Sequence, residues 1–292
     1  MSYLKIENRG VCPTEGFTVL GASMATSSSI GQFGSGNKLG VSTLLRNGIN
    51  PIIFCGKTRL QFSTEKQSVT NGLDTKEFER VTVKYSGGRT GSERLGYVLD
   101  YGKHEWSDTS LALREFVSNA IDREMAEFNN WDGVKVELVE DSQVRAKEGL
   151  TRIFIPLNED VIKFRLNLNK WFLHFGEPNL LNTTILPKAD RSLTGKKCAV
   201  IYRKGVRVRE FEVGQTQSLF DYNLDSLRID EARKASDWDV KYYCGMALAN
   251  SSVDTLVKLF SHLLTGTFSA WEFSFDEFSL TRNVNPVVCE QW

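Results

Sequence analysis

Two short segments constrain the fold most, because one leads into a predicted helix and the other lies within a predicted helix. Residues 30–38 (IGQFGSGNK) form a glycine-rich turn that leads into a predicted helix. Residues 115–122 (EFVSNAID) place two acids and an amide within a later helix. Backbone N–H groups at the start of a helix suit phosphate, and carboxylate and amide oxygens suit Mg²⁺. The two segments together predict a nucleotide site.

The glycine-rich turn has three positions without a Cβ atom, Gly31, Gly34 and Gly36, followed by the cation of Lys38. Successive N–H groups there can face an anion. The turn is not a P-loop, because no Gly-Lys-Ser/Thr follows it, and it is not a dinucleotide fingerprint, because Leu39 stands where the third glycine belongs. A simple glycine-rich connection remains the alternative.

The later helix carries a polar stripe made of Glu115, Asn119 and Asp122. At 100° per residue the three positions fall within about 60° of one another, opposite the apolar face. The alternative is that this stripe is only the solvated side of an amphipathic helix. Against it, asparagine is unfavourable in a helix interior, so its place there calls for a reason.

These motifs resemble those of the GHKL superfamily, which includes gyrase, the ninety-kilodalton heat-shock chaperones, histidine kinases and MutL. Residues 115–122 resemble the family's N-box, and residues 30–36 resemble its second glycine box. Residues 4–11 resemble a degraded first glycine box, and residues 20–23 resemble the start of the nucleotide lid. The resemblance covers about residues 3–160. It implies an α/β (α+β) fold of the Bergerat type, an ATP-binding sandwich with a mixed sheet and helices on one face.

The order of the motifs is inverted relative to the family, which runs N-box, first glycine box, lid, second glycine box. A circular permutation explains the inversion, and chance assembly of unrelated fragments is the competing explanation. The first glycine box also lacks the aspartate that reads the adenine amino group in the family. Glu7 or Asn8 stands in its region.

The resemblance implies ATP and Mg²⁺ as ligands and a role for each matched residue. Glu115 is expected to activate the attacking water, Asn119 to ligate Mg²⁺, and Asp122 to support the nucleotide side of the helix. The remaining expected contacts are to phosphates from Gly31, Gly34, Gly36 and Lys38, and to the base from Glu7 or Asn8.

The chain is expected to form two domains, a permuted GHKL-like ATP-binding domain over residues 1–160 and a smaller α+β domain of unknown role over residues 161–292. Periodicity and turn residues predict the elements of both. Strands are expected at 3–7, 51–55, 59–62, 79–85, 97–101, 134–139 and 151–156, with helices at 38–46 and from about 109 to 130. The second domain is expected to have a strand-like stretch at 164–175, a hairpin at 198–213 and mostly helix at 238–264.

The composition of the whole chain sets limits on its partners and location. Its 292 residues include 36 basic and 36 acidic side chains, so net charge gives no general attraction to nucleic acid or membrane. Five scattered cysteines without a Cys-x-x-Cys pair predict reduced thiols in a cytoplasm and no zinc site. No signal peptide or membrane-spanning run is evident in the sequence.

The leading functional hypothesis is an Mg-dependent ATP-binding protein, a slow ATPase whose nucleotide state controls conformation or the binding of a protein partner. One alternative is a nucleotide-binding interaction module without turnover. Another is a nucleic-acid-binding protein that uses the basic hairpin at residues 196–209.

Overall fold

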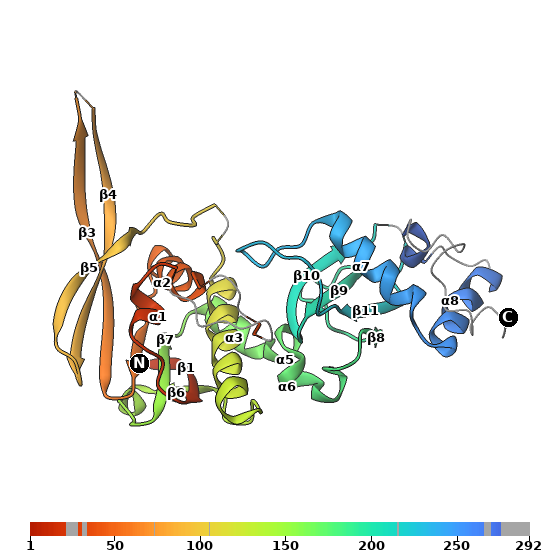
Figure 1. Cartoon of the computed structure of the whole chain (residues 1–292), viewed down its shortest axis with the longest axis horizontal. Coiled ribbons are helices and arrows are strands. Elements are labelled where there is room, and N and C mark those ends of the chain that lie inside the picture. Colours follow the sequence, from red (N-terminus) through yellow and green to blue (C-terminus); the bar gives the residue numbers. More distant parts are fainter. Residues whose placement is uncertain are drawn as a thin grey trace. The chain divides into compact units, whose positions relative to one another are not determined.

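A computed structural model of the chain describes residues 1–21, 29–30, 34–72, 74–104, 106–214, 216–265 and 270–275. The chain forms two compact units, Met1–Leu166 and Asn167–Trp292 (Figure 1). The boundary predicted from the sequence lies at residue 160. The structure places it after helix α4 (Glu159–Leu166), because α4 contacts α3 (Thr109–Phe128) and β1 (Ser2–Arg9) of the first unit.

The first unit is built on a seven-stranded sheet with the order β5-β4-β3-β2-β7-β1-β6. All strand pairings in the described part of this sheet are antiparallel. The expectation of a mixed sheet is therefore wrong for this unit. Short turns join β2 through β5, and tight turns permit only antiparallel neighbours. Its remaining elements, in chain order, are α1 (Glu15–Thr18), α2 (Gly36–Arg46), β2 (Ile52–Cys55), β3 (Thr58–Asn71), β4 (Asp74–Gly87), β5 (Gly91–Val98), β6 (Lys135–Glu140), η1 (Asp141–Gln143) and β7 (Leu150–Pro156).

The two faces of this sheet are covered differently. One face of the central strands carries a cluster of Tyr3, Phe54, Val139 and Phe154, onto which Val144 of the β6–β7 connection packs. Helix α3 contacts β1 and α2. Side chains alternate along a strand, so we place the helices over the other face, which bears the buried residues Leu4, Ile6, Ile153 and Ile155.

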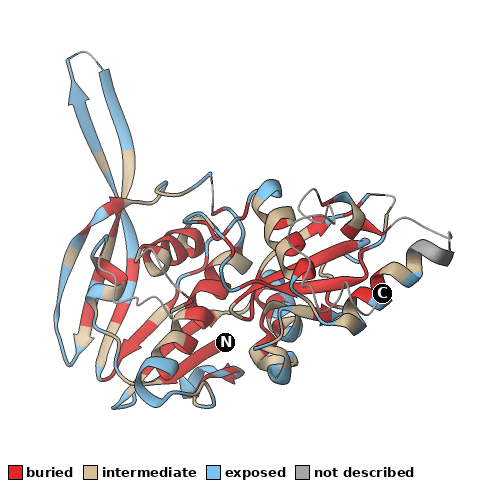
Figure 2. Ribbon diagram, turned by 45° about the vertical axis from the view of Figure 1, so that its right-hand side comes forward, coloured by how far each residue is buried: buried red, intermediate tan, exposed pale blue. Residues whose placement is uncertain are grey.

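Strands β3 and β4 extend well beyond their neighbours as a two-stranded arm (Figure 1). Strand β2 pairs with β3 only as far as Gln61, and β5 pairs with β4 only from Arg80 onward. Between these points most side chains are exposed (Figure 2). Sequence analysis predicts only the proximal parts, 59–62 and 79–85, because the distal parts lack the apolar alternation of a half-buried strand.

Helices α2 and α3 form where their sequences predict, although α2 begins at Gly36, before the expected start at 38, and α3 ends at Phe128, before the expected end near 130. The side chain of Asp108 caps α3 by accepting a hydrogen bond of 2.8 Å from the N–H of Ser110. Asn129 ends α3 in the left-handed conformation. Asn47 and Gly48, with φ of 71° at Gly48, end α2. These termini confirm the two predicted helices.

The second unit is also α+β, with a four-stranded sheet in the order β10-β9-β11-β8. The predicted hairpin is confirmed as β9 and β10, which turn at Lys204 and Gly205 with φ of 50° and 72°. The predicted strand-like stretch at 164–175 is wrong, because its closely spaced aromatic residues lie mainly in short helices. The elements are α5 (Leu168–Trp171), α6 (Leu173–Gly176), η2 (Pro178–Leu180), β8 (Ile185–Pro187), β9 (Cys198–Arg203), β10 (Val206–Glu212), β11 (Phe220–Asn223), α7 (Asp237–Ala249), α8 (Val253–Thr265) and η3 (Trp271–Ser274).

Candidate functional site

The polar stripe of α3 lies against the turn that opens α2. Helix α2 approaches α3 closely through Gly36 and Gly40, which are one turn apart. A Cβ atom at Gly36 would overlap the carboxylate of Glu115, and one at Gly40 would lie 3.0 Å from Cζ of Phe116. The Glu115 carboxylate therefore sits at the first residue of α2, where the helix dipole favours negative charge.

Asn119 meets the same turn one residue further along. Its Nδ2 donates a hydrogen bond of 2.8 Å to Oδ1 of Asn37. The Nδ2 of Asn37 in turn donates a longer bond, 3.4 Å, to the carbonyl oxygen of Gly16 in α1. The Oδ1 atom of Asn119 accepts no hydrogen bond from the part of the chain that the structure describes.

Asp122 completes the stripe at the other end of the turn. Its Oδ1 accepts a hydrogen bond of 2.6 Å from the backbone N–H of Ile30. Glu115 is only 5% exposed, and Asn119 and Asp122 are partly buried. The alternative that the stripe is a solvated helix face is therefore wrong.

The turn itself has the features of an anion site. Gly34 has a φ of 69°, a conformation that favours glycine, and its carbonyl oxygen accepts a bond of 2.6 Å from Nζ of Lys38. Ser35 precedes α2 without forming a side-chain cap, and the first turn contains no acid. The N–H groups of Lys38 and Leu39 both donate to the carbonyl oxygen of Ser35 at 3.0 Å, and the positive end of the helix dipole at this turn favours an anion.

Lys38 brings a buried cation to this turn, since its side chain is almost completely enclosed. Burial lowers the pKa of Lys38 from its ordinary value, because desolvation penalises the charged form. A nearby anion would favour that charged form. Gly31 lies outside the described residues, as does most of the predicted lid.

The predicted base-contacting residues separate onto opposite faces of β1. The carboxylate of Glu7 accepts a bond of 2.8 Å from Nε of Arg152, which also bonds to the carbonyl oxygen of Arg145 in the β6–β7 connection. The structure thus does not bring Glu7 to the turn. Asn8 points to the helix-covered face, beside its register partner Thr151.

Cys12 lies next to this face, since its N–H donates a bond of 2.8 Å to Oγ1 of Thr151. Burial raises the pKa of the Cys12 thiol to about 11. The thiol is therefore protonated at neutral pH and is a poor nucleophile. The groups of this region that can bind a ligand are therefore its oxygen and cationic groups, and not this thiol.

The donor set fits Mg²⁺ with a phosphate ligand. The amide oxygen of Asn119 and the carboxylates of Glu115 and Asp122 are hard oxygen ligands, the type that Mg²⁺ takes. Among the described residues no group of three or more His, Cys, Asp or Glu side chains is arranged to hold a metal. Mg²⁺ bound with phosphates needs only one or two protein ligands, so the fit does not require such a group.

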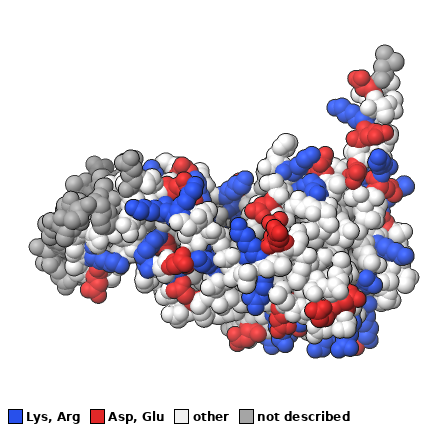
Figure 3. Space-filling view, turned by 180° about the vertical axis from the view of Figure 1, so that it is seen from behind, with Lys and Arg blue, Asp and Glu red and all other residues white. Residues whose placement is uncertain are grey.

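The basic hairpin of the second unit uses much of its charge internally. Arg203 and Arg207 are buried, and they donate to the carbonyl oxygens of Leu227 and Lys170. Lys196 pairs with Glu212 at 2.7 Å. On the face that Figure 3 draws, basic and acidic side chains are interspersed. This arrangement gives little support to the nucleic-acid alternative.

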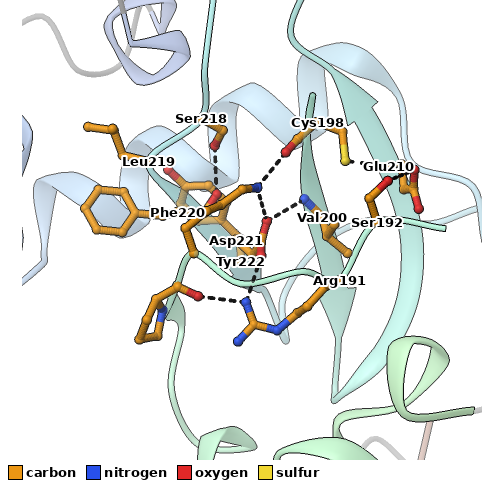
Figure 4. Close-up of polar contacts among 12 residues, drawn as sticks. Arg191, Ser192, Cys198, Val200, Glu210, Ser218, Leu219, Phe220, Asp221 and Tyr222 are labelled. Atoms are coloured by element: carbon orange, nitrogen blue, oxygen red, sulfur yellow. Dashed lines mark hydrogen bonds and ion pairs between the residues drawn. The ribbon is translucent and has the colours of Figure 1, made fainter. Parts of the chain in front are cut away.

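A second cluster of charges lies in the interior of the second unit (Figure 4). Asp221 is fully buried and accepts bonds from Arg191 (2.7 Å), Lys188 (2.6 Å) and the N–H of Val200 (2.9 Å). Arg191 also makes two bonds to Glu177, of 2.6 and 2.8 Å. The Asp221 carboxylate is well satisfied within the unit, so this cluster is structural.

Comparison of the chain with protein-family models, curated proteins and solved structures gave no match. None of the helices in the described ranges is both long enough and apolar enough to cross a membrane. Asn37 was not among the predicted site residues, and its only signal in the sequence is its position directly after Gly36.

Proposed function

We propose that the first unit binds Mg-ATP at the junction of the α2 turn and the α3 stripe, and that it is a slow ATPase of the GHKL type. One observation carries the proposal. Three polar side chains of α3, at positions 115, 119 and 122, meet both ends of the turn, the first two at Gly36 and Asn37 and the third at Ile30. A phosphate held by the turn would therefore lie beside oxygen ligands for its metal.

The proposed roles follow from these positions. Gly34, Gly36 and Lys38 bind phosphate through backbone donors and the buried ammonium group. Asn119 presents an oxygen to Mg²⁺, which when bound neutralises charge on phosphate oxygens. Glu115 orients or deprotonates water, and Asp122 holds the start of the turn through the N–H of Ile30. Asn8, and not Glu7, lies on the face suited to a base contact.

The positions of the strand ends support a permuted order of the GHKL motifs. Tyr3 at the start of β1 pairs with Pro156 at the end of β7, and the N–H of Leu157 donates a bond of 3.2 Å to the carbonyl oxygen of Ser2. If a short link joined the end of β7 to the start of β1, and the chain were opened before α3, the motifs would follow in the order α3, β1, turn, α2. That order is the one expected for the family, so the difference reduces to where the chain is cut.

Calorimetry with Mg-ATP, Mg-ADP and Mg-GTP tests the proposal directly. We expect Mg-dependent binding of ATP and a gain in unfolding free energy of about 2.7 kcal/mol at a hundredfold excess over Kd. Asn119→Ala should lose the Mg-dependent part of the affinity. Asn250→Ala, at the end of α7 in the second unit, is the control and should bind as the wild type does. An unchanged melting temperature with millimolar Mg-ATP would contradict the proposal.

The exposed β3–β4 arm favours a second reading of the same site, a nucleotide-gated interaction module without turnover. Its side chains are largely open to solvent and therefore available to a protein partner. A phosphate-release assay separates the two readings. Binding of Mg-ATP without release of phosphate would assign the module.

A further inference from the structure

The side-chain amides of Asn119 and Asn37 form a chain of defined polarity that ends at a backbone carbonyl. The oxygen of Gly16 can only accept, so it takes the Nδ2 of Asn37 at 3.4 Å. This leaves the Oδ1 of Asn37 to accept from the Nδ2 of Asn119 at 2.8 Å. An amide has its donor and acceptor at opposite ends, so the direction of the Asn119 oxygen is fixed as well.

We propose that Asn37 is a positioning residue, which holds the amide of Asn119 with its oxygen toward a bound divalent cation. The inference rests on the proposed Mg-ATP site and adds a residue to it. Asn37 acts through Asn119 and need not touch the nucleotide.

The reason is the chemistry of the two ends of an amide. Only the oxygen can ligate a cation, and a rotated amide would present its NH₂ group instead. Rotation of Asn119 would also bring its oxygen against the Oδ1 of Asn37, two acceptors without a proton between them. The bond from Asn119 to Asn37 therefore excludes the orientation that cannot bind metal, and the ligand is preorganised before the cation arrives.

The absence of an acceptor at position 37 should weaken metal binding selectively. Partners that orient a metal ligand typically contribute 10–100-fold to metal affinity. For Asn37→Ala we expect the Mg²⁺ concentration that half-saturates ATP binding to rise about 10–100-fold. The affinity for ATP measured in EDTA should stay within about twofold of the wild type, because no phosphate contact is removed.

Two further variants of the full-length chain sharpen the test. Asn37→Asp keeps the acceptor for Asn119 and should restore the Mg²⁺ requirement to the wild-type value or below. Asn47→Ala is the matched control at the other end of α2, where Nδ2 of Asn47 donates a bond of 2.9 Å to Oγ1 of Thr109. It should leave the Mg²⁺ requirement unchanged.

The measurement is calorimetric titration of ATP at a series of Mg²⁺ concentrations, with circular dichroism as the check on folding. Absence of Mg-dependent binding in the wild type would defeat the proposed function itself. Normal binding in the wild type with an unchanged Mg²⁺ requirement in Asn37→Ala would overturn only the positioning role. Equal losses with Mg²⁺ and in EDTA would overturn it too, by showing a direct contact. If Asn37→Ala does not fold, Asn37→Ser replaces it, since its shorter side chain cannot reach Asn119.

Discussion

The Nδ2 atom of Asn119 donates a hydrogen bond of 2.8 Å to Oδ1 of Asn37, a residue 82 positions earlier in the chain. The backbone N–H of Ile30 likewise donates a hydrogen bond of 2.6 Å to Oδ1 of Asp122, across 92 positions. These contacts explain why α3 carries a stripe of buried and partly buried polar residues on the side opposite its apolar face. The stripe is buried against a second polar segment, and a buried polar group without a partner would cost free energy.

Glu115 is the first residue whose role can be tested alone. Glu115→Gln should keep ATP binding and lower the hydrolysis rate by about 10²–10⁴-fold, the usual contribution of a general base. Its carboxylate occupies the N-terminus of α2, so removing the charge should leave Mg-ATP affinity equal or higher, because a competing anion is lost. Single-turnover hydrolysis and calorimetry measure the two effects.

Glu127→Gln is the control for this prediction. Glu127 lies on the same helix and pairs with Arg123, away from the turn. Its loss should change neither binding nor hydrolysis. Normal hydrolysis by Glu115→Gln would show that the base lies elsewhere.

Gly34 and Gly48 allow a matched test at the two ends of α2. Their φ angles are 69° and 71°, so alanine imposes a similar strain of about 1–2 kcal/mol at each. Only Gly34 belongs to the proposed phosphate turn. Gly34→Ala should weaken ATP binding at least tenfold, while Gly48→Ala should lower the melting temperature comparably and bind ATP normally. Equal affinities in the two variants would place the phosphates elsewhere.

The two helices that frame the candidate site were predictable from the sequence, because local signals specify them. Caps and periodicity define α2 and α3, and glycine spacing marks the turn. The choice between Glu7 and Asn8 depends on which face of β1 meets the helices, and an isolated strand does not reveal that. The outer parts of β3 and β4 were missed, since their mostly polar, exposed side chains carry no pattern of burial.

Asp221 should be essential for the stability of the second unit. Removing one partner of a buried ion pair leaves an uncompensated charge, which costs about 3–5 kcal/mol. Asp221→Ala should cost this much, because it leaves the buried guanidinium of Arg191 with a partner missing. Glu212→Ala removes the exposed pair with Lys196 and should cost far less, because solvent screens this pair. Urea unfolding compares them, and equal losses would contradict the structural role of Asp221.

The β3–β4 arm should be dispensable for folding. A two-stranded hairpin is marginally stable by itself, and few residues of the outer arm are buried. Replacing residues 67–78 with Asn-Gly, between the paired residues Lys66 and Glu79, should change the unfolding free energy by less than about 1 kcal/mol. Leu60→Ala, at a fully buried position of the same strand, should cost about 2–5 kcal/mol. A large loss on shortening the arm would show that it packs on the unit.

Glu272 should make the second unit less stable as pH rises above the acid range. The carboxylate is fully buried. Its Oε1 accepts bonds from Ser218 (2.8 Å) and from the N–H groups of Leu219 (2.9 Å) and Phe220 (3.3 Å), whereas Oε2 has no partner among the described residues. Burial raises the pKa of Glu272 above its ordinary value, and the hydrogen bonds that the carboxylate accepts lower the pKa by less than burial raises it.

The direction of this change in stability with pH follows from proton binding to the folded and unfolded states. The unfolded chain releases the Glu272 proton near its ordinary pKa, about 4.5, while the folded unit keeps it to a higher pH. The contribution of Glu272 to stability is thus complete below that value and is lost as pH rises through the folded pKa. Burial also raises the pKa values of the neighbouring Tyr222 and Cys244, so both stay neutral over this range.

Glu272→Gln, which cannot ionise, should remove this loss of stability. The local readout is hydrogen exchange of the Leu219 and Phe220 amides, corrected for the intrinsic pH dependence of exchange. In the wild type their protection should fall as pH rises through the raised pKa of Glu272, and in the variant it should stay level. The acid-side loss of stability should remain in both proteins, because Glu210, whose pKa is lowered by hydrogen bonds from Leu193 and Thr194 despite its burial, still titrates there. Parallel protection profiles above the acid range in the two proteins would show that Glu272 is already ionised there in the folded unit.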